Sequence, residues 1–91
     1  MKKINSTVNN MLVRIIGRKA MKEYEVFRSW NTLVGDHVAQ NSVPIKVENG
    51  VLHVSVKSSV WRQELRMLRP QILKKIDEEF GKGIIRDIQL K

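Results

Sequence analysis

The sequence has no cysteine, only two histidines and few aromatic residues: two Trp, two Phe and one Tyr. Without cysteine the chain can form no disulfide and no thiolate metal site, and two histidines argue against zinc. No apolar run approaches the roughly 20 residues of a membrane-spanning helix. The N-terminus MKKINSTVNN lacks the apolar core of a signal peptide. We therefore expect a cytoplasmic protein with no cofactor, no bound metal and no membrane partner.

Acidic residues are also few, with 9 Asp and Glu against 17 Lys and Arg, so the formal net charge is +8 and the pI about 10.2. Such an excess favours an anionic partner, with nucleic acid first and a membrane surface second. The alternative is a basic domain with no such partner. The 91 residues suffice for one modest core, so we treat residues 1–91 as a single domain.

Residues 43–57 predict a β-hairpin around which the rest of the chain is organised. Asn49 and Gly50 tolerate the positive φ that a two-residue type I′ turn requires. That turn sets the strand register, and the alternation of apolar residues agrees with it. The expected pairs are Glu48 with Val51, Val47 with Leu52, and Ile45 with Val54. The expected core face consists of Ile45, Val47, Leu52, Val54 and Val56.

Two helices are predicted before this hairpin. The first covers residues 4–17, where apolar residues recur at helical spacing and Gly17 provides a stop. Residues 18–22 fit either a loop or a frayed continuation of that helix. The second helix covers about 22–34 and ends at Gly35, and residues 36–42 form an irregular segment or a single turn. The apolar stripe of the first helix consists of Ile4, Val8, Met11, Leu12, Ile15 and Ile16.

A third helix is predicted from about 59 to 80, with Ser58 and Ser59 as capping candidates. Pro70 lies inside its pattern, so we expect a kink there or two helices that meet at that residue. The segment IIRDIQLK at the end then predicts a third strand. The order helix, helix, strand, strand, helix, strand fits a two-layer α+β domain of the KH-like kind, in which helices cover one face of a three-stranded sheet.

The sequence shows no catalytic constellation. Asp77, Glu78 and Glu79 are consecutive at a helix end and point in different directions. His37 and His53 belong to different elements, and the GKG at 81–83 follows a helix instead of preceding one, unlike a phosphate loop. We therefore expect neither an enzyme nor a small-molecule substrate.

Four cations form the candidate nucleic-acid site. Arg62, Arg66 and Arg69 fall on one side of the third predicted helix, and Lys57 lies just before it. These side chains indicate an edge that faces phosphates or acidic groups. The alternative is a solvated face whose arginine stems cover apolar surface.

Trp30 and Trp61 each lie in phase with an apolar helix face, which is typical of core anchors. The alternative is that one ring is partly exposed and serves as a contact for a partner protein. Trp61 is the candidate partner-binding residue, because it opens its helix at the exit of the hairpin.

An ordered series of residues resembles the DciA family, also known as domain of unknown function 721. The series comprises Trp30-x-x-Leu33-Val34-Gly35, Val38-Ala39, Ser42-x-Pro44, Gly50-x-Leu52-x-Val54-x-Val56 and Ser59-x-Trp61-x-x-Glu64-Leu65. The resemblance runs from about residue 30 to the last predicted strand. It implies a KH-like domain of bacterial proteins that assist the loading or operation of the replicative DNA helicase, and some members bind DNA.

The chain also departs from this pattern. Longer relatives carry a disordered tail that takes part in helicase binding, whereas this chain stops at Lys91. The GxxG loop of true KH domains is missing, and the nearest segment, residues 35–38, has one glycine. We expect a non-enzymatic accessory protein of DNA replication that contacts the helicase and binds DNA weakly and without sequence preference. The alternatives are a general RNA- or DNA-binding module and a protein-interaction domain with an acidic partner.

Overall fold

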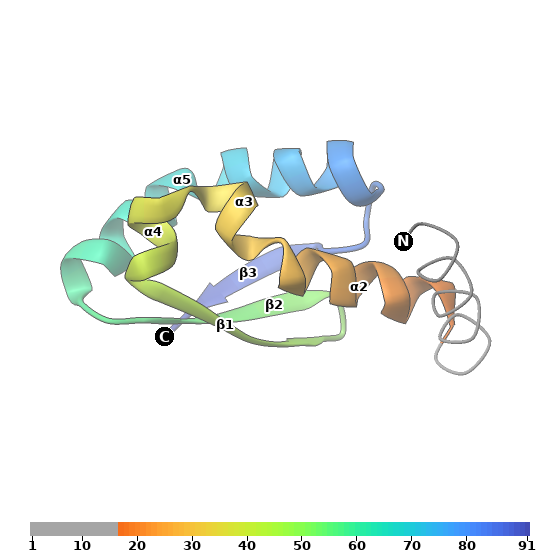
Figure 1. The fold of residues 1–91 in the computed structure, drawn as a ribbon, viewed down its shortest axis with the longest axis horizontal. Helices are drawn as coiled ribbons and strands as arrows, with labels where there is room; N and C mark the ends of the chain where they lie inside the picture. The colour runs from red at the N-terminus through yellow and green to blue at the C-terminus, as the bar shows by residue number, and fades with distance from the viewer. Residues whose placement is uncertain (1–16) are drawn as a thin grey trace, which may run out of the picture.

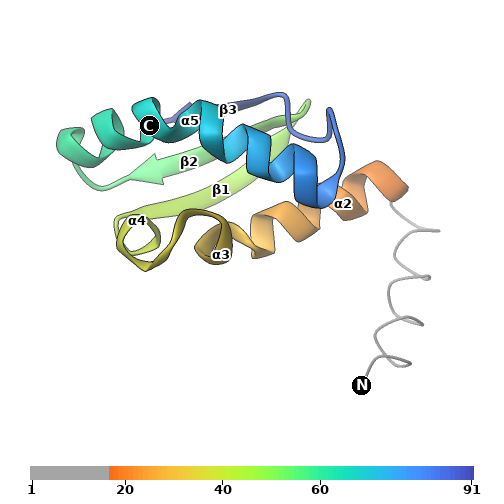
Figure 2. The same ribbon diagram turned by 90° about the horizontal axis from the view of Figure 1, so that it is seen from above.

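The computed structural model describes residues 17–91, so the helix predicted over residues 4–17 lies, apart from Gly17, outside the described residues. The elements are α2 (Arg18–Arg28), α3 (Trp30–Val34), α4 (Asp36–Gln40), β1 (Ser42–Glu48), β2 (Val51–Val56), α5 (Ser59–Phe80) and β3 (Asp87–Leu90). The sheet has the order β1-β2-β3, with β1 antiparallel and β3 parallel to β2. Figures 1 and 2 show α5 above the sheet and α2, α3 and α4 along its β1 side. The fold is therefore α+β, with a mixed three-stranded sheet.

The helix expected over about 22–34 begins earlier and is interrupted. Residues 18–22 are the first turns of α2, and Ser29 separates α2 from α3. The Ser29 N–H donates to the carbonyls of both Glu25 and Val26, which ends the regular helical ladder. The next residue, Trp30, is 3% exposed, and its indole Nε1 donates to Ser42 Oγ at 3.0 Å. The break therefore lies where the chain turns a large ring into the core, a tertiary effect that overrides helix propensity.

The hairpin forms at the expected turn, because Asn49 and Gly50 have φ values of 54° and 78°. The pairs Glu48–Val51 and Val47–Leu52 are confirmed. The pairing of Ile45 with Val54 is wrong. Pro44 pairs with Val54 and Lys46 with His53, so Ile45 is the extra residue of a bulge.

The placement of Ile45 in the core is also wrong, since its side chain is 53% exposed. Pro44 gives a local reason for the bulge. Proline has no N–H for the ladder and is tolerated in strands mainly at edges and bulges. The inward side of the sheet is otherwise as expected, with Leu52, Val54 and Val56 buried and Val47 half-buried.

A single helix, α5, spans the whole of the third predicted helix, and Pro70 lies within it. Ser58 caps its start, because its Oγ accepts a hydrogen bond from the Trp61 N–H at 3.2 Å. The ribbon of α5 bends along its length (Figure 1), and proline is a known cause of such bending. The helix buries Leu65, Ile72 and Ile76 against Leu52 and Val54 of the sheet and Ile85 and Ile88 of the C-terminal segment.

Candidate functional site

Helical spacing puts the three arginines on one side of α5, and two of them, Arg66 and Arg69, lie at the outer edge of β3. Arg66 and Arg69 line a groove with the whole of that strand. The residues of this β3-edge groove are Val51, Arg66, Arg69, Asp87, Ile88, Gln89 and Leu90. Two of the four predicted cations therefore line one concave site, whereas Lys57 and Arg62 do not line it.

Arg69 is held by the strand beneath it. Its Nη1 donates to the Ile88 carbonyl at 3.2 Å, and the side chain is half-buried. An edge strand presents backbone groups that no neighbouring strand satisfies, and a side-chain donor compensates one of them. Arg69 thus has a structural partner as well as a position in the groove.

Arg66 is the exposed guanidinium of the groove. Its nearest hydrogen-bond partner is Gln63 Oε1 at 3.5 Å, a long and weak contact. Asp87 also lines the groove, but it forms no ion pair with Arg66; the salt bridge found among residues 17–91 joins Lys46 and Glu48 at 3.6 Å. Arg66 is therefore free to bind an anion from solution.

The remaining two cations differ in exposure. Lys57 is exposed and follows β2, where its backbone N–H donates to the Asn41 carbonyl at 3.1 Å. Arg62 is half-buried, and its Nε is buried without a hydrogen-bond partner among the described residues. Two of the four predicted cations, Lys57 and Arg66, are thus exposed, and two are partly buried against the domain.

The two tryptophans also differ. Trp30 is a core residue. The Ser42 hydroxyl that accepts from its indole in turn donates to the Val38 carbonyl at 2.7 Å. Trp61 is half-buried and packs against the core cluster. The geometry is therefore compatible with Trp61 as a contact residue and places Trp30 in the interior.

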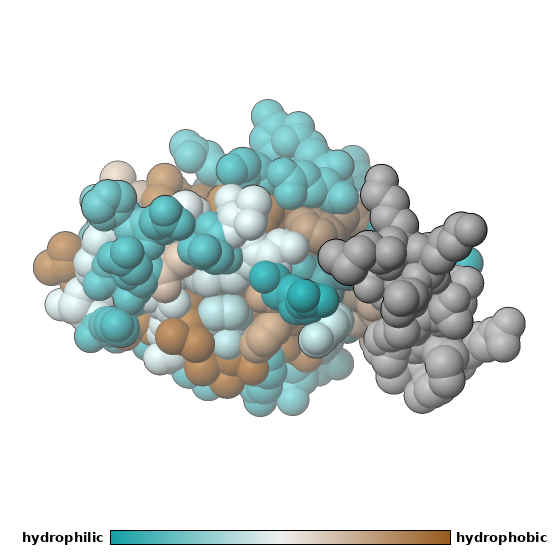
Figure 3. Space-filling view, viewed as in Figure 1, coloured by the Kyte–Doolittle hydropathy of each residue, from teal (hydrophilic) through white to brown (hydrophobic). Residues whose placement is uncertain are grey.

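One surface feature was missed by the sequence reasoning. An apolar band follows β1, where Val43 and Ile45 are 51% and 53% exposed. A hollow lies between α2 and β1 and is lined by Ala20, Glu23, Tyr24, Phe27 and Val47. Figure 3 shows hydrophobic side chains gathered along the part of the surface where β1 runs. The bulge produces this exposure, and the even alternation of apolar residues in the sequence gave no sign of it.

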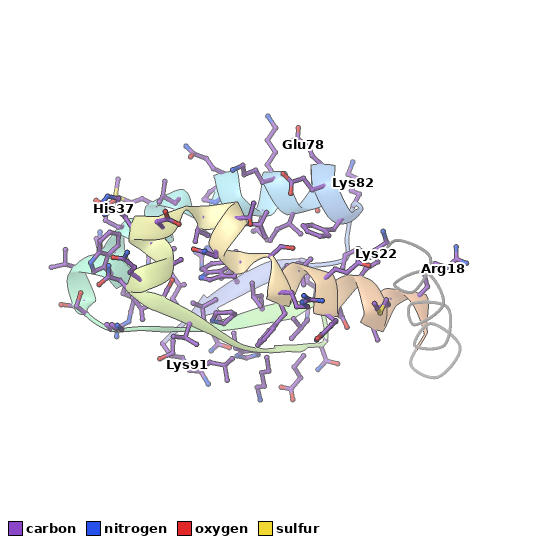
Figure 4. The ribbon with its side chains drawn as sticks, viewed as in Figure 1. Arg18, Lys22, His37, Glu78, Lys82 and Lys91 are labelled. Atoms are coloured by element: carbon purple, nitrogen blue, oxygen red, sulfur yellow. The ribbon has the colours of Figure 1, made fainter. Side chains whose placement is uncertain are left out.

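The titratable side chains of the described part are dispersed. Figure 4 shows His37 on α4 at the opposite end of the domain from Glu78 and Lys82, with all three side chains directed outward. No group of three or more His, Asp and Glu residues within 17–91 is placed to hold a metal ion. None of the helices in the same range is long and apolar enough to cross a bilayer.

These features define a small, basic α+β domain with a mixed three-stranded sheet and an arginine-lined strand edge. The family model described as "Dna[CI] antecedent, DciA" matches residues 3–90. The chain therefore belongs to the DciA family, as the residue series from Trp30 to Leu65 had indicated.

Curated relatives are longer proteins. The chain is 34% identical over 68 residues to the UPF0232 protein of Mycobacterium leprae (strain TN), which covers 75% of this chain and 36% of that protein. It is 33% identical over 84 residues to the UPF0232 protein of Mycolicibacterium paratuberculosis, which covers 87% of this chain and 46% of that protein. A UPF0232 protein of Rhodococcus jostii is 33% identical over 70 residues, and this match covers 77% of this chain and 37% of that protein. The chain thus spans less than half the length of these relatives.

Proposed function

We propose that this protein is a non-enzymatic accessory factor of bacterial DNA replication that contacts the replicative helicase and binds DNA weakly through its basic surface. The observation that carries the proposal is the family match across residues 3–90. The pairing of an antiparallel hairpin with a parallel third strand further supports a KH-like domain.

The proposed DNA contact depends on charge. The chain has a net charge of +8. Arg66 is an exposed cation of the β3-edge groove, and Lys57 is an exposed cation that follows β2. Lysine and arginine contacts to phosphate give affinity that does not depend on base sequence and that falls with salt. The absence of a GxxG loop argues against a KH-type clamp on a single strand.

The helicase contact is tested with purified proteins. We expect the full chain, immobilised, to retain the replicative helicase of its own bacterium, and we expect Trp61→Ala to weaken that retention. Because the ring is half-buried, this truncation should cost about 2 kcal/mol of stability, less than the roughly 3–5 kcal/mol of a fully buried tryptophan.

Leu68→Ala is the matched control, because Leu68 is also half-buried on α5 and packs against the same core. If both variants retain the helicase as the unchanged chain does, Trp61 is a packing residue and not a contact. If the unchanged chain retains no helicase, the proposed function is wrong.

A further inference from the structure

The outer edge of β3 carries backbone groups that the sheet does not use. Lys91 donates its N–H to the Val54 carbonyl at 2.9 Å and accepts from the Val56 N–H at 3.1 Å, so both of its backbone groups face β2. Backbone groups alternate in direction along a strand, so those of Leu90 and Ile88 face away from β2. The hydrogen bond from Arg69 to the Ile88 carbonyl is consistent with this direction. One donor and one acceptor of Leu90, and the N–H of Ile88, therefore face the groove.

The two arginines of the groove lie toward one of its ends. α5 and β3 run in opposite directions, so the start of α5 lies over the end of β3 (Figure 1). Arg66 precedes Arg69 by three residues, or about 4.5 Å along a helix, and therefore lies toward Leu90. Asp87 lies at the other end of the same groove. The positive charge of the groove thus lies toward its Leu90 end.

We propose that the β3-edge groove binds an extended acidic segment of a partner protein, which adds to the sheet as a fourth strand beside β3. The backbone of the segment would pair with Leu90 and Ile88, in the manner of other strand-addition complexes. Its N–H would replace the Arg69 guanidinium on the Ile88 carbonyl. Arg69 and Arg66 would then both be available to the carboxylates of the segment.

The chemistry of the edge favours a peptide over a nucleic-acid strand. The edge offers both N–H donors and a free carbonyl acceptor, and a peptide backbone satisfies both. Phosphate oxygens only accept, so a DNA strand that meets the edge through its phosphates would give the Leu90 carbonyl no donor and would face it with negative charge. A peptide strand can instead pair with both kinds of backbone group and direct its carboxylates toward Arg66 and Arg69.

This inference goes beyond the proposed function, because it assigns a surface and a binding mode without assuming that the helicase is the partner. The test uses the full chain labelled with 15N and a blocked peptide of about six alternating Glu and Val residues, the usual length of a strand. We expect the peptide to shift the amide signals of Ile88 and Leu90. A second peptide, methylated on alternate backbone nitrogens, lacks the donors that pair with β3 and should bind about tenfold more weakly.

Side-chain variants separate the groove from general charge attraction. Arg66→Gln should weaken the peptide about tenfold, as expected for a charge-assisted hydrogen bond. Lys74→Gln removes the same charge from an exposed position of α5 outside the groove and should leave the affinity within about twofold. Equal affinity of the methylated and unmethylated peptides would overturn the proposal. So would an oligothymidylate of about 12 nucleotides that shifts the Ile88 and Leu90 amides when the peptide does not, since the groove would then be a DNA site.

Discussion

The two edges of the sheet are protected by different means. At β1 the backbone itself is irregular: Pro44 lacks an N–H, and the extra residue at Ile45 interrupts the pairing. At β3 the backbone is regular, and a side chain covers it through the hydrogen bond from Arg69 to Ile88. Both devices discourage uncontrolled pairing between sheets. A partner strand cannot pair regularly with the interrupted backbone of β1, whereas the Arg69 side chain can move away from the backbone of β3. Of the two edges, only the β3 edge can therefore accept an added strand.

The two edges also differ in the polarity of the side chains beside them. The β1 edge is apolar, with Val43 and Ile45 exposed next to the hollow that contains Tyr24. An exposed apolar band on a regular edge would favour aggregation, so the bulge and the proline are suited to that edge. The β3 edge has arginines whose charge keeps it soluble, and it can therefore remain regular. The comparison predicts that the exposed apolar side chains of β1 contribute to self-association, and that the exposed cation of the β3 edge contributes to binding.

The largest effect is expected at the turn that joins β1 to β2. Gly50 has φ of +78°, and a Cβ built there lies 3.3 Å from the Arg86 Cγ. Gly50→Val should therefore destabilise the domain by about 1–3 kcal/mol from backbone strain alone, measured by urea unfolding. Gly50→Asn is the control, because asparagine tolerates positive φ and should cost less. A melting temperature unchanged by the valine would contradict the turn assignment.

A smaller effect is expected when the side-chain cover of β3 is removed. Arg69→Gln takes away the donor to the Ile88 carbonyl, so we expect a loss of about 0.5–1.5 kcal/mol in unfolding free energy. Arg66→Gln, three residues away and exposed, should change stability by less than about 0.5 kcal/mol. If the two variants are equally stable, Arg69 does not protect the edge, and the difference between the edges is smaller than described.

Ile45 tests the other edge. Because the bulge exposes this side chain, Ile45→Thr should change the unfolding free energy by no more than about 0.5 kcal/mol. Val54→Thr places the same hydroxyl in a site that is 0% exposed and should cost about 1–3 kcal/mol. A comparable loss of unfolding free energy in both variants would show that Ile45 lies on the core face, as the alternation of apolar residues in the sequence predicted. Sedimentation of Ile45→Thr should also show less self-association than the unchanged chain.

Local signals explain which parts of the fold were predictable. The turn at Asn49 and Gly50 and the cap at Ser58 depend on neighbouring residues only, and both were anticipated from the sequence. The break at Ser29 depends on the burial of Trp30 against Ser42, 12 residues away, which no local pattern contains. The bulge had a local signal in Pro44, but the regular apolar alternation concealed it.

The candidate site was predictable in part for the same reason. Helical spacing alone placed Arg62, Arg66 and Arg69 on one side of α5. The partial burial of Arg69 involves β3, which follows in the chain after a helix end and a loop. The bond between Arg69 and Ile88 joins residues 19 positions apart, and sequence spacing cannot show such a contact.

The smallest effect on stability, and the sharpest on DNA binding, is expected from the two exposed cations of the predicted nucleic-acid site, Lys57 and Arg66. Lys57→Gln combined with Arg66→Gln keeps the length of the side chains and removes two charges, so unfolding should change by less than about 0.5 kcal/mol. If both contact duplex phosphates, the slope of log K against log salt should fall by up to about 0.9 for each lost contact. Arg62→Gln is the comparison, because its Nε is buried and fewer of its donors reach solvent; it should change the slope less. A slope unchanged in the double variant would move the DNA contact elsewhere, with the next candidates Lys2, Lys3, Arg14, Arg18, Lys19 and Lys22. The β3 edge would then be left to the acidic peptide alone.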